Sequence, residues 1–470
     1  ARITEKERTL VQEESLPAAD GYWFALFPPL PVSQGLRRRS LRISLFSTQT
    51  CRHAEAPLLY LPKGGSLEVA TLLGRGELLQ GPRMFLATNT LGGMLRAPLI
   101  WGRLESRYDA LLAANRNPEI PEDRWVLLTR CRCWIVYQAY SQELRFDCFH
   151  TFHLDPGGRG LWRFHVPTGQ GEHVRITVRA ELAPSENTLD LLFFRHPAEG
   201  RDGRLSDEKP VRLIVRPDVE SRNFHQITKA YLGPEENWRQ AVAPGVDGFV
   251  FAPEPDLHLA VTFPDSQFVS EPEWHYMVHH PGELERGFDP SSDLFSPGYF
   301  KATLLGGTPL VMTACACSDP EQEHRKMGSL DISEETLYEL PRTFSFQETV
   351  EMALDRFVVR RGALKTIIAG YPWFLDWGRD SLIVVRGLVA AGRLADARAV
   401  LRQFGQFEKG GMLPYMIAGK RAANLDTSDA PLWFFVGCRE MVRKEKSLRF
   451  LDTRVNRRTV REILFSIARS

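Results

Sequence analysis

The stretch "GYPWFLDWGRDSLIVVRGL", residues 370–388, gathers side chains that could do chemistry. Asp376, Trp377, Arg379 and Asp380 stand directly before an apolar run that is typical of a helix. A carboxylate offers parallel hydrogen-bond acceptors, an arginine offers a fork of donors, and an aromatic ring offers a flat apolar face. A sugar would use all three, because its vicinal hydroxyls pair with the polar groups and its C–H faces stack on rings.

Three interpretations of this stretch are open. Carbohydrate binding ranks first, a buried structural cluster of salt bridges second, and a cation or phosphate site third. Asp380 also has a purely structural interpretation, because it is well placed to cap or complement the amino end of the following helix. A cap does not account for the other residues, since the loop carries more hydrogen-bonding capacity than a cap requires.

A second group of candidates lies in "NLDTSDAPLWFF", residues 424–435, where Asp426, Asp429 and Trp433 surround an expected helix start. Asp429 again could be only an N-cap. The two helix starts would share one end of an α/α array if the helices alternate in direction and two or four helices lie between them. We expect such an arrangement to form a pocket. Hydrolysis of a glycosidic bond would further need two carboxyls, ~6.5–9.5 Å apart for inversion or ~5 Å for retention, which the sequence cannot measure.

The elements that must position these residues follow from hydrophobic periodicity. Near residue 345 the period changes from two to 3.6, and "SFQETVEMALDRFVVRRG" predicts a helix with a capping box of Ser345 and Glu348, Val358 on its apolar face, and Gly362 at its end. Four more helices are predicted at residues 380–391, 394–408, 430–445 and 454–469. Short loops join them, so we expect an α/α array. The apolar face of the last helix has no obvious later partner: Val455, Val460, Ile463, Leu464 and Ile467.

Residues 75–340 have the texture of a β domain, with short Val-, Ile-, Leu- and Phe-rich runs separated by turn residues. In "HVRITVRAEL" the residues Val174, Ile176 and Val178 alternate with polar ones, which predicts a strand with one wet face. Many such runs predict a large antiparallel β-sandwich. Residues 1–74 are predicted to be irregular, with the arginine-rich run 37–42 a solvated basic loop rather than a recognition patch. The expected domains are therefore 1–74, 75–340 and 341–470.

The composition excludes several classes of partner. The 470 residues, enough for two to four domains, include 59 basic and 58 acidic side chains, so no global field favours nucleic acid or an anionic membrane. There is no apolar run of about 18 residues and the chain starts with a charged segment, so we expect neither export nor a membrane span.

Seven scattered cysteines favour the reducing cytosol, and we expect a cytoplasmic protein. Neither the Cys-x-Cys pairs at 131/133 and 315/317 nor the histidines 275, 279 and 280 are expected to bind metal, and we expect no cofactor.

Longer stretches carry a family resemblance. "ALDRFVVRRG" followed by "KTIIAGYPWFLDWGRDSLIVVRGLVAAGR" closely resembles the opening of the catalytic domain of prokaryotic glycogen debranching enzymes of the amylo-α-1,6-glucosidase type. "NLDTSDAPLWFF" is similar to an element that follows there, and "FLATNTLGGML", "ESRYDALLAA", "VRPDVESRNFH" and "ERGFDPSSDLFSPGYF" resemble the amino-terminal β domain of that family. The resemblance covers roughly residues 80 to 470.

The resemblance implies a β-sandwich followed by an (α/α)6 toroid, with removal of the α-1,6-linked glucose left at a trimmed branch of glycogen or limit dextrin. The segment Trp377–Asp380 is also similar to the Trp-Thr-Arg-Asp of glucoamylases, where Arg and Asp grip the terminal glucose. Carried over, Arg379 and Asp380 are the glucose-binding candidates. Trp377 and Trp433 would be stacking walls, and Asp376 and Asp429 supporting ligands.

The sequence differs from the family pattern at two positions and lacks the motif that carries the family's general acid. Asp109 stands where the family usually has His after Arg-Tyr, and Asp426 where it usually has Asn. The family's general acid lies in a Thr-Trp-Met-Asp element after the fifth or sixth helix, and its base later still; neither occurs before Ser470. We therefore expect a truncated chain with an incomplete toroid and no catalytic acid or base, which does not release glucose by itself.

The alternatives are a glycan-binding protein without catalysis and a related α-glucosidase such as a glucoamylase or trehalase.

Overall fold

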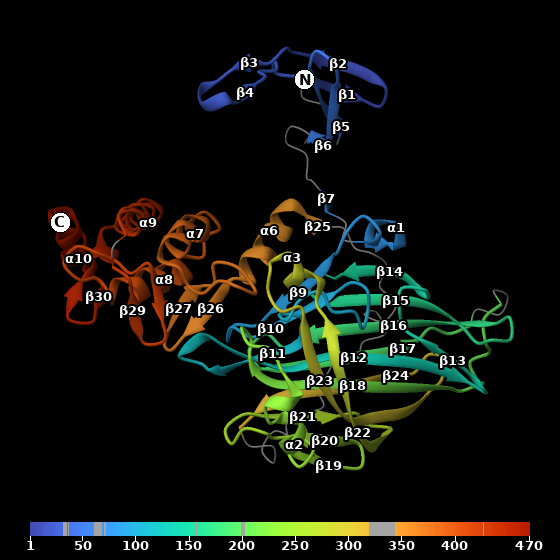
Figure 1. The fold of residues 1–470 in the computed structure, drawn as a ribbon. Coiled ribbons are helices and arrows are strands. Elements are labelled where there is room, and N and C mark those ends of the chain that lie inside the picture. Colours follow the sequence, from blue (N-terminus) through green and yellow to red (C-terminus); the bar gives the residue numbers. More distant parts are fainter. Residues whose placement is uncertain are drawn as a thin grey trace. The chain divides into compact units, whose positions relative to one another are not determined.

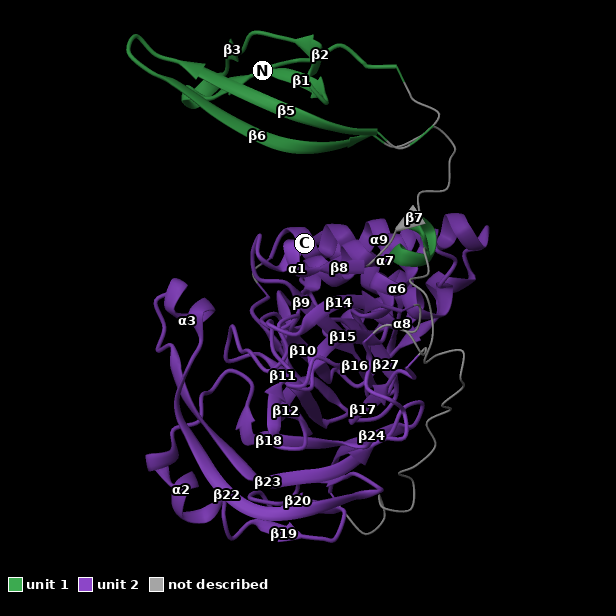
Figure 2. Ribbon diagram, turned by 90° about the vertical axis from the view of Figure 1, so that its right-hand side faces the viewer, with its two compact units in different colours: residues 1–70, 343–350 green, residues 71–342, 351–470 purple. Residues whose placement is uncertain are grey.

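A computed structural model describes residues 1–31, 35, 37–60, 68–69, 72–155, 158–198, 203–318, 344–425 and 427–470. The chain divides into two compact units, residues 1–70 with 343–350 and residues 71–342 with 351–470 (Figure 2). The helices longer than two turns all follow residue 344 in this part of the chain, and sheets dominate the rest (Figure 1).

The first unit contains an antiparallel sheet, which corrects the prediction of an irregular segment. Its order is β2 (Arg8–Gln12), β1 (Arg2–Glu5), β5 (Arg37–Phe46) and β6 (Cys51–Tyr60). The arginine-rich run lies on β5 and not in a loop, because β5 and β6 pair without a break from Arg37↔Tyr60 to Phe46↔Cys51. Smaller elements are the strand pairs β3 (Leu16–Pro17) with β4 (Trp23–Phe24) and β7 (Glu68–Val69) with β25 (Phe344–Ser345), and η1 (Ala19–Gly21).

Two large antiparallel sheets form the sheet-rich part of the second unit. One follows the order β22 (Ser266–His279), β23 (Ser291–Leu304), β18 (Val211–Asn223), β12 (Ile120–Tyr137), β11 (Ala110–Asn117), β10 (Met94–Pro98) and β9 (Met84–Thr88), with β13 (Tyr140–Glu143) paired to β12. The other follows β19 (Val242–Pro244), β20 (Gly248–Phe251), β21 (His258–Thr262), β24 (Pro309–Cys317), β17 (Thr188–Arg195), β16 (His173–Leu182), β15 (Gly160–Pro167), β14 (Phe149–Leu154) and β8 (Leu72–Gly74). Short helical turns decorate them: α1 (Arg75–Leu78), η2 (Ala230–Leu232), α2 (Pro234–Asn237) and α3 (Pro281–Glu285).

The two sheets share one hydrophobic core, as the sequence predicted. Leu128 and Val215 from the first sheet and Phe164 and Ile176 from the second are fully buried in the same cluster. Burial of apolar surface from both sheets is what holds such layers together.

One detail of β16 differs from the prediction of a wet face. Val174, Ile176 and Val178 face the core, yet Thr177 and Arg179, which alternate with Ile176 and Val178, are also buried. β16 lies inside the nine-stranded sheet, and Thr177 Oγ1 lies 2.7 Å from His196 Nε2, while Arg179 pairs with Glu181 at 3.8 Å. Buried polar groups on this strand are therefore held by partners on the same face.

The region after residue 344 begins as predicted and then departs from the prediction. Glu348 N donates to Ser345 Oγ (3.2 Å) and Ser345 N donates to Glu348 Oε2 (2.8 Å), which completes the capping box of α6 (Phe346–Asp355). The predicted helix to Gly362 is wrong, because α6 ends at Asp355. Val358 instead belongs to β26 (Val358–Arg361), which pairs with β27 (Leu364–Ile367), and Gly362 sits in the turn with φ +55°.

Four helices build a second core beside the sheets (Figure 1). They are α7 (Gly378–Ala390), α8 (Leu394–Gly405), α9 (Asp429–Glu445) and α10 (Val460–Arg469). The helix predicted at residues 394–408 is α8, which ends earlier, at Gly405, and buries one apolar face made of Ala397, Val400, Leu401 and Phe404. Linking elements are β28 (Met416–Ala418), β29 (Arg421–Ala423), η3 (Arg449–Asp452), β30 (Arg454–Val455) and β31 (Arg458–Thr459).

The last predicted helix is corrected in two respects. It starts at Val460, because residues 454–459 form the β30–β31 hairpin. Its apolar face does have a partner: Val460 and Ile463 are fully buried in the second core, and the side chain of Ile463 lies against Gly405 of α8. Val455, Val460, Ile463 and Ile467 of this segment are therefore buried against the other helices, whereas Phe465 is exposed.

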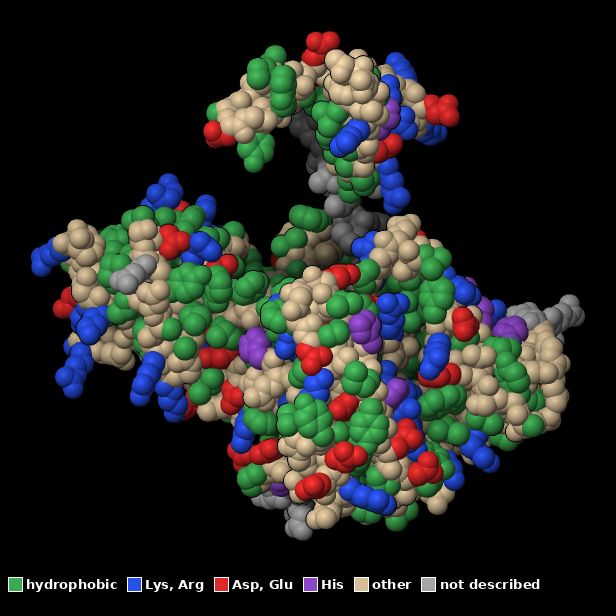
Figure 3. All heavy atoms as spheres, in the orientation of Figure 1, with side chains coloured by type: hydrophobic (Ala, Val, Ile, Leu, Met, Phe, Trp, Pro, Cys, Tyr) green, Lys and Arg blue, Asp and Glu red, His purple; other side chains and the backbone are tan. Residues whose placement is uncertain are grey.

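Charges of both signs are interspersed over the sheet-rich part on the side shown in Figure 3, as the near-zero net charge leads one to expect. In the described part of the chain no helix combines the length and apolar character needed to cross a bilayer.

The second core generates a stability prediction. Phe404 is fully buried between the helices, whereas Phe465 on α10 is 57% exposed. We expect Phe404→Ala to lower the free energy of unfolding of the helical region by about 3–5 kcal/mol, since a buried phenylalanine loses both its transfer energy and its packing. Urea denaturation followed by circular dichroism measures the change. Phe465→Ala is the matched control and should change the value by less than about 1 kcal/mol; equal losses in both variants would contradict the described core.

Candidate functional site

The starts of α7 and α9 bring three of the predicted residues together. Arg379 is about half exposed and lies between two carboxylates: its Nη1 is 3.6 Å from Asp429 Oδ2 and its Nε is 3.9 Å from Asp380 Oδ2. The carboxylates are also partly exposed, at 41% and 38% of their side chains. Both separations exceed that of a tight ion pair, so the donors of Arg379 and the acceptors of the two carboxylates are not held in close hydrogen bonds with each other and can serve a ligand.

One expected geometrical condition was wrong. A single helix, α8, lies between α7 and α9, not two or four. Helices that alternate in direction put every second start at the same end, so one intervening helix is what the geometry requires. The Arg379–Asp429 distance confirms that the two starts meet.

Neither Asp380 nor Asp429 forms an N-cap hydrogen bond with its helix. Asp380 lies in the first turn of α7, where its charge complements the helix dipole, and the N-cap residue is Trp377. Asp429 is the first residue of α9, and Ser428 is the N-cap. No side chain caps either helix through a hydrogen bond, and Asp380 Oδ2 has no hydrogen-bond partner in the described structure. Asp380 Oδ2 is itself buried, but the side chains of Asp380 and Asp429 are 38% and 41% exposed, so each carboxylate can still accept a hydrogen bond from a ligand at its exposed part.

Aromatic rings stand beside this charged group. Trp377 packs against Tyr415, with ring centroids 4.9 Å apart, and against Phe374 at 5.1 Å. Trp433 is half-buried on α9 and lies under the guanidinium of Arg386 at 5.9 Å. Flat apolar faces and charged donors and acceptors therefore occur together near the starts of α7 and α9.

Asp376 has surroundings quite different from those of its neighbours. It is fully buried, and its Oδ2 lies 3.0 Å from Arg361 Nη1 and accepts a hydrogen bond from Thr366 Oγ1 at 3.0 Å. Arg361 also binds Glu122 Oε2 at 2.7 Å. The structure thus places Asp376 in a buried salt-bridge cluster, which was the second-ranked interpretation of this stretch, and not beside Arg379.

Two carboxylates share the single cation of this cluster. Burial raises the pKa of Asp376 to about 8, Arg361 opposes this rise, and the nearby Glu122 adds to it. One positive charge, that of Arg361, cannot balance two carboxylates, so a protonated, neutral Asp376 beside an ionised Glu122 fits the cluster. Gly419 closes the cluster, since its N–H donates to Glu122 Oε1 at 2.9 Å and its carbonyl accepts from Arg361.

Gly378 sets how closely α7 approaches the β28–β29 region. A Cβ at this position would lie 2.3 Å from the carbonyl oxygen of Pro414, so no other residue fits without moving backbone. The Gly378 N–H donates to Tyr415 O at 2.7 Å. This close contact fixes the direction in which the next two residues, Arg379 and Asp380, leave the loop.

A buried arginine supports the loop from beneath. Arg124 is fully buried on β12, with its guanidinium 4.4 Å from the ring of Phe224 and 4.8 Å from that of Tyr371. It donates to Phe374 O at 3.4 Å. Cation–π contacts gain strength when desolvated, so this arginine anchors the aromatic loop on the sheet.

The other candidates have structural surroundings. Asp109, the departure from the family pattern, is buried, binds Arg96 and accepts from the N–H groups of Glu105 (2.6 Å) and Ser106 (2.9 Å). No group of ligands that could hold a metal occurs among the described residues, and the cysteines at 131, 133, 315 and 317 are buried on strands. Asp426 lies outside the described residues.

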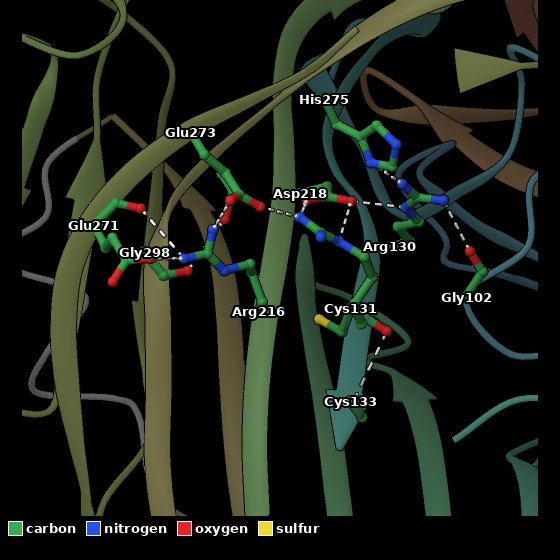
Figure 4. A network of polar contacts seen from close by, with 12 residues as sticks. Gly102, Arg130, Cys131, Cys133, Arg216, Asp218, Glu271, Glu273, His275 and Gly298 are labelled. Carbon is green, nitrogen blue, oxygen red and sulfur yellow. Dashed lines mark hydrogen bonds and ion pairs between the residues drawn. The ribbon is translucent and has the colours of Figure 1, made fainter. Parts of the chain in front are cut away.

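The outer face of the eight-stranded sheet carries a separate charged network (Figure 4). Asp218 is fully buried between Arg130 and Arg132, both at 2.7 Å, and Glu273 bridges Arg132 (2.9 Å) to Arg216 (2.5 Å). Arg130 also contacts His275 Nδ1 at 3.0 Å, so the histidine segment is structural. Each charged residue of the network contacts a residue of opposite charge. We therefore interpret the network as structural, since it links β12, β18 and β22.

A cavity of about 450 Å³ between the sheets and the β26–β27 hairpin includes none of the six predicted site residues. Two of its cations, Lys365 and Arg393, are already paired with Asp396 at 2.5 and 2.6 Å. We therefore assign no ligand to it.

Comparison with protein families identifies two regions of the chain. The model described as "Glycogen debranching enzyme N terminal" matches residues 83–311, and the model described as "Amylo-alpha-1,6-glucosidase" matches residues 352–469. The second region contains all six predicted site residues. No curated protein matches the sequence.

Solved structures give more distant similarities. A bacterial glucoamylase complexed with acarbose is 11% identical with a TM-score of 0.40, over 87% of this chain and 59% of that one. A polysaccharide lyase is 13% identical with a TM-score of 0.24, over 53% and 34%. The chain thus spans about three fifths of the glucoamylase's length.

Sequence reasoning missed three residues of the site. Tyr415 and Phe374 flank Trp377, and Arg361 holds Asp376. Phe374 stands within the quoted stretch and could have been found from its aromatic character. Tyr415 and Arg361 had no local signal, because their contacts arise from the hairpins that bring them to the loop.

The cluster around Asp376 predicts an unusual pH dependence. The folded-state pKa of about 8 lies above the ~3.9 of an unfolded aspartate, so the stabilisation is complete below pH ~4 and is lost as the pH rises through ~8. Asp376→Asn mimics the neutral acid and does not titrate. We expect the free energy of unfolding of the wild type, minus that of the variant, to fall between pH 5 and 8 by up to roughly 1.4 kcal/mol per pH unit.

Urea titrations at several pH values measure this difference. Asp396→Asn is the control: burial of Asp396 is outweighed by Lys365 and Arg393, which lower its pKa, so no such fall should appear. A difference for Asp376→Asn that stays constant from pH 5 to 8 would show that Asp376 is ionised in the folded protein.

Proposed function

The chain belongs to the glycogen debranching enzymes, and from this premise we propose that it binds the terminal glucose of an α-1,6 branch of glycogen or limit dextrin for hydrolysis. The observation that carries the proposal is the position of Arg379, half exposed between Asp380 and Asp429. The guanidinium fork suits two vicinal hydroxyls, and the carboxylates accept their hydrogen bonds.

Each predicted residue receives a role in this proposal. Arg379 and Asp380 grip the sugar, and Asp429 orients Arg379 and adds an acceptor. Trp377, held between Tyr415 and Phe374, offers the ring face against which a sugar C–H face stacks. Trp433 forms a second wall, and Asp376 supports the site from within the fold and not as a direct ligand.

We further propose that α7, α8 and α9 are the first members of an (α/α)6 toroid, with a β-sandwich domain before them at about 75–340. The alternating directions of the three helices support this arrangement, because it places the starts of α7 and α9 at one end. Sugar-binding residues on successive starts would then line one mouth of the toroid.

The proposed reaction needs a general acid and a second carboxylate on opposite sides of the scissile bond. Asp380 and Asp429 both face Arg379, and we assign them to binding. We assign neither of these catalytic carboxyls here, and the role proposed for Arg379, Asp380 and Asp429 is to hold the sugar.

Binding is tested by substitution at Arg379. We expect Arg379→Ala to weaken the binding of maltoheptaose about 10- to 100-fold, because a hydrogen bond to a charged group contributes roughly 1.5–3 kcal/mol. Isothermal titration calorimetry measures the affinity. Arg439→Ala, which removes an exposed arginine elsewhere on α9, is the control and should bind like the wild type. Unchanged binding by Arg379→Ala would refute the proposed site.

The linkage is tested by glucose release. We expect the enzyme to release glucose from a glycogen limit dextrin and not from α,α-1,1-linked trehalose. Preference for α-1,4-linked maltose would instead identify a glucoamylase-like enzyme, and preference for trehalose would overturn the proposed linkage.

A further inference from the structure

Exposed aromatic side chains continue from the candidate sugar site toward the sheets. Trp373 and Phe374, in the same loop as Trp377, are 41% and 43% exposed, and Phe288 beside α3 is 50% exposed. α3 stands at the end of the long β22–β23 ribbon (Figures 1 and 2). We call Phe288, Trp373, Phe374 and Trp377, together with Arg286, the aromatic stripe.

The members of the aromatic stripe form an unbroken series of contacts. Phe374 lies 5.1 Å from Trp377 and 6.5 Å from Trp373, measured between ring centroids. The guanidinium of Arg286 then bridges the sheets and the loop, since it lies 5.4 Å from the ring of Trp373 and 5.1 Å from that of Phe288. The series therefore runs from the start of α7 to the end of α3.

Buried groups hold the far end of the stripe in place. Phe288 contacts two guanidinium groups, since Arg107 lies 5.0 Å and Arg286 5.1 Å from the centroid of its ring. Arg107 in turn binds the fully buried Glu283 at 2.9 Å. Such fixed side chains lose little freedom when a ligand binds.

The near part of the stripe is supported in the same way. Trp373 packs edge-on against the buried ring of Tyr108 at 6.4 Å, and the Tyr108 hydroxyl lies 3.1 Å from His225 Nδ1. Aromatic rings that are rigid and still half exposed are costly to leave in water, and a contiguous exposed apolar surface marks a binding site.

We infer that the aromatic stripe binds the α-glucan chain that extends from the sugar held by Arg379, so that the sheet-rich part of the protein supplies part of the substrate site. This inference rests on the proposed function. Continuity with the sugar site argues for a glucan as the occupant, because successive glucose units of one chain present C–H faces to rings and hydroxyls to arginine. Phe288 and Arg286 would engage units remote from the terminal glucose.

The test compares a long and a short ligand in the 470-residue chain. We expect Phe288→Ala and Arg286→Ala each to weaken maltoheptaose binding about five- to tenfold in calorimetry and to leave glucose binding unchanged. Both side chains are at the surface, and circular dichroism melts confirm that the variants fold. Phe465→Ala, which removes an exposed phenylalanine of α10, is the matched control and should leave both affinities unchanged.

The outcomes separate this inference from the proposed function. Suppose that Arg379→Ala binds neither ligand, while Phe288→Ala and Arg286→Ala bind maltoheptaose like the wild type. This result would support the sugar site at Arg379 and would contradict glucan binding by the aromatic stripe. Equal losses for glucose and maltoheptaose in Phe288→Ala would also overturn it, since the stripe should not touch the terminal sugar. A wild-type chain that binds neither ligand would overturn both proposals.

Discussion

A single buried cation, Arg361, ties together the parts on which the candidate site depends. It is shared by Glu122 at 2.7 Å and Asp376 at 3.0 Å, and it also binds the carbonyl of Gly419. These groups come from β12, from the loop before α7 and from the turn between β28 and β29, while Arg361 itself ends β26. Buried charges are stable only when their partners are complete. The position of the loop at residues 370–377 is therefore inseparable from that of the sheet beneath it.

The loop at residues 370–377 serves both sides of this arrangement. Tyr371 and Asp376 are buried, the first against Arg124 and the second against Arg361, whereas Trp373 and Phe374 are exposed. Burial at both ends of the loop explains how large apolar rings can be presented to solvent without collapsing onto the core. One short segment therefore contains both the buried residues that anchor the loop and the exposed residues that we propose bind the ligand.

The sequence predicted those features whose signals are local. The apolar face of α8, around Val400 and Phe404, follows from helical periodicity, and the pairing of Arg379 with acidic residues follows from adjacent helix starts. The strand β5 was not predicted, because its arginine run was interpreted as a solvated loop; the alternation of Leu41, Ile43 and Leu45 with polar residues is the local signal of this strand. The burial of Asp376 could not be predicted, because Glu122 and Arg361 reach it only through tertiary structure.

Gly378 leaves the start of α7 no space for a side chain. The carbonyl oxygen of Pro414 would lie 2.3 Å from a Cβ at this position, and the Gly378 N–H donates to the carbonyl oxygen of Tyr415 at 2.7 Å. A larger residue would therefore separate α7 from residues 414–415 and break this hydrogen bond. Arg379 and Asp380 would move with the end of the helix, so a substitution that touches neither side chain would change the distance of both from Asp429.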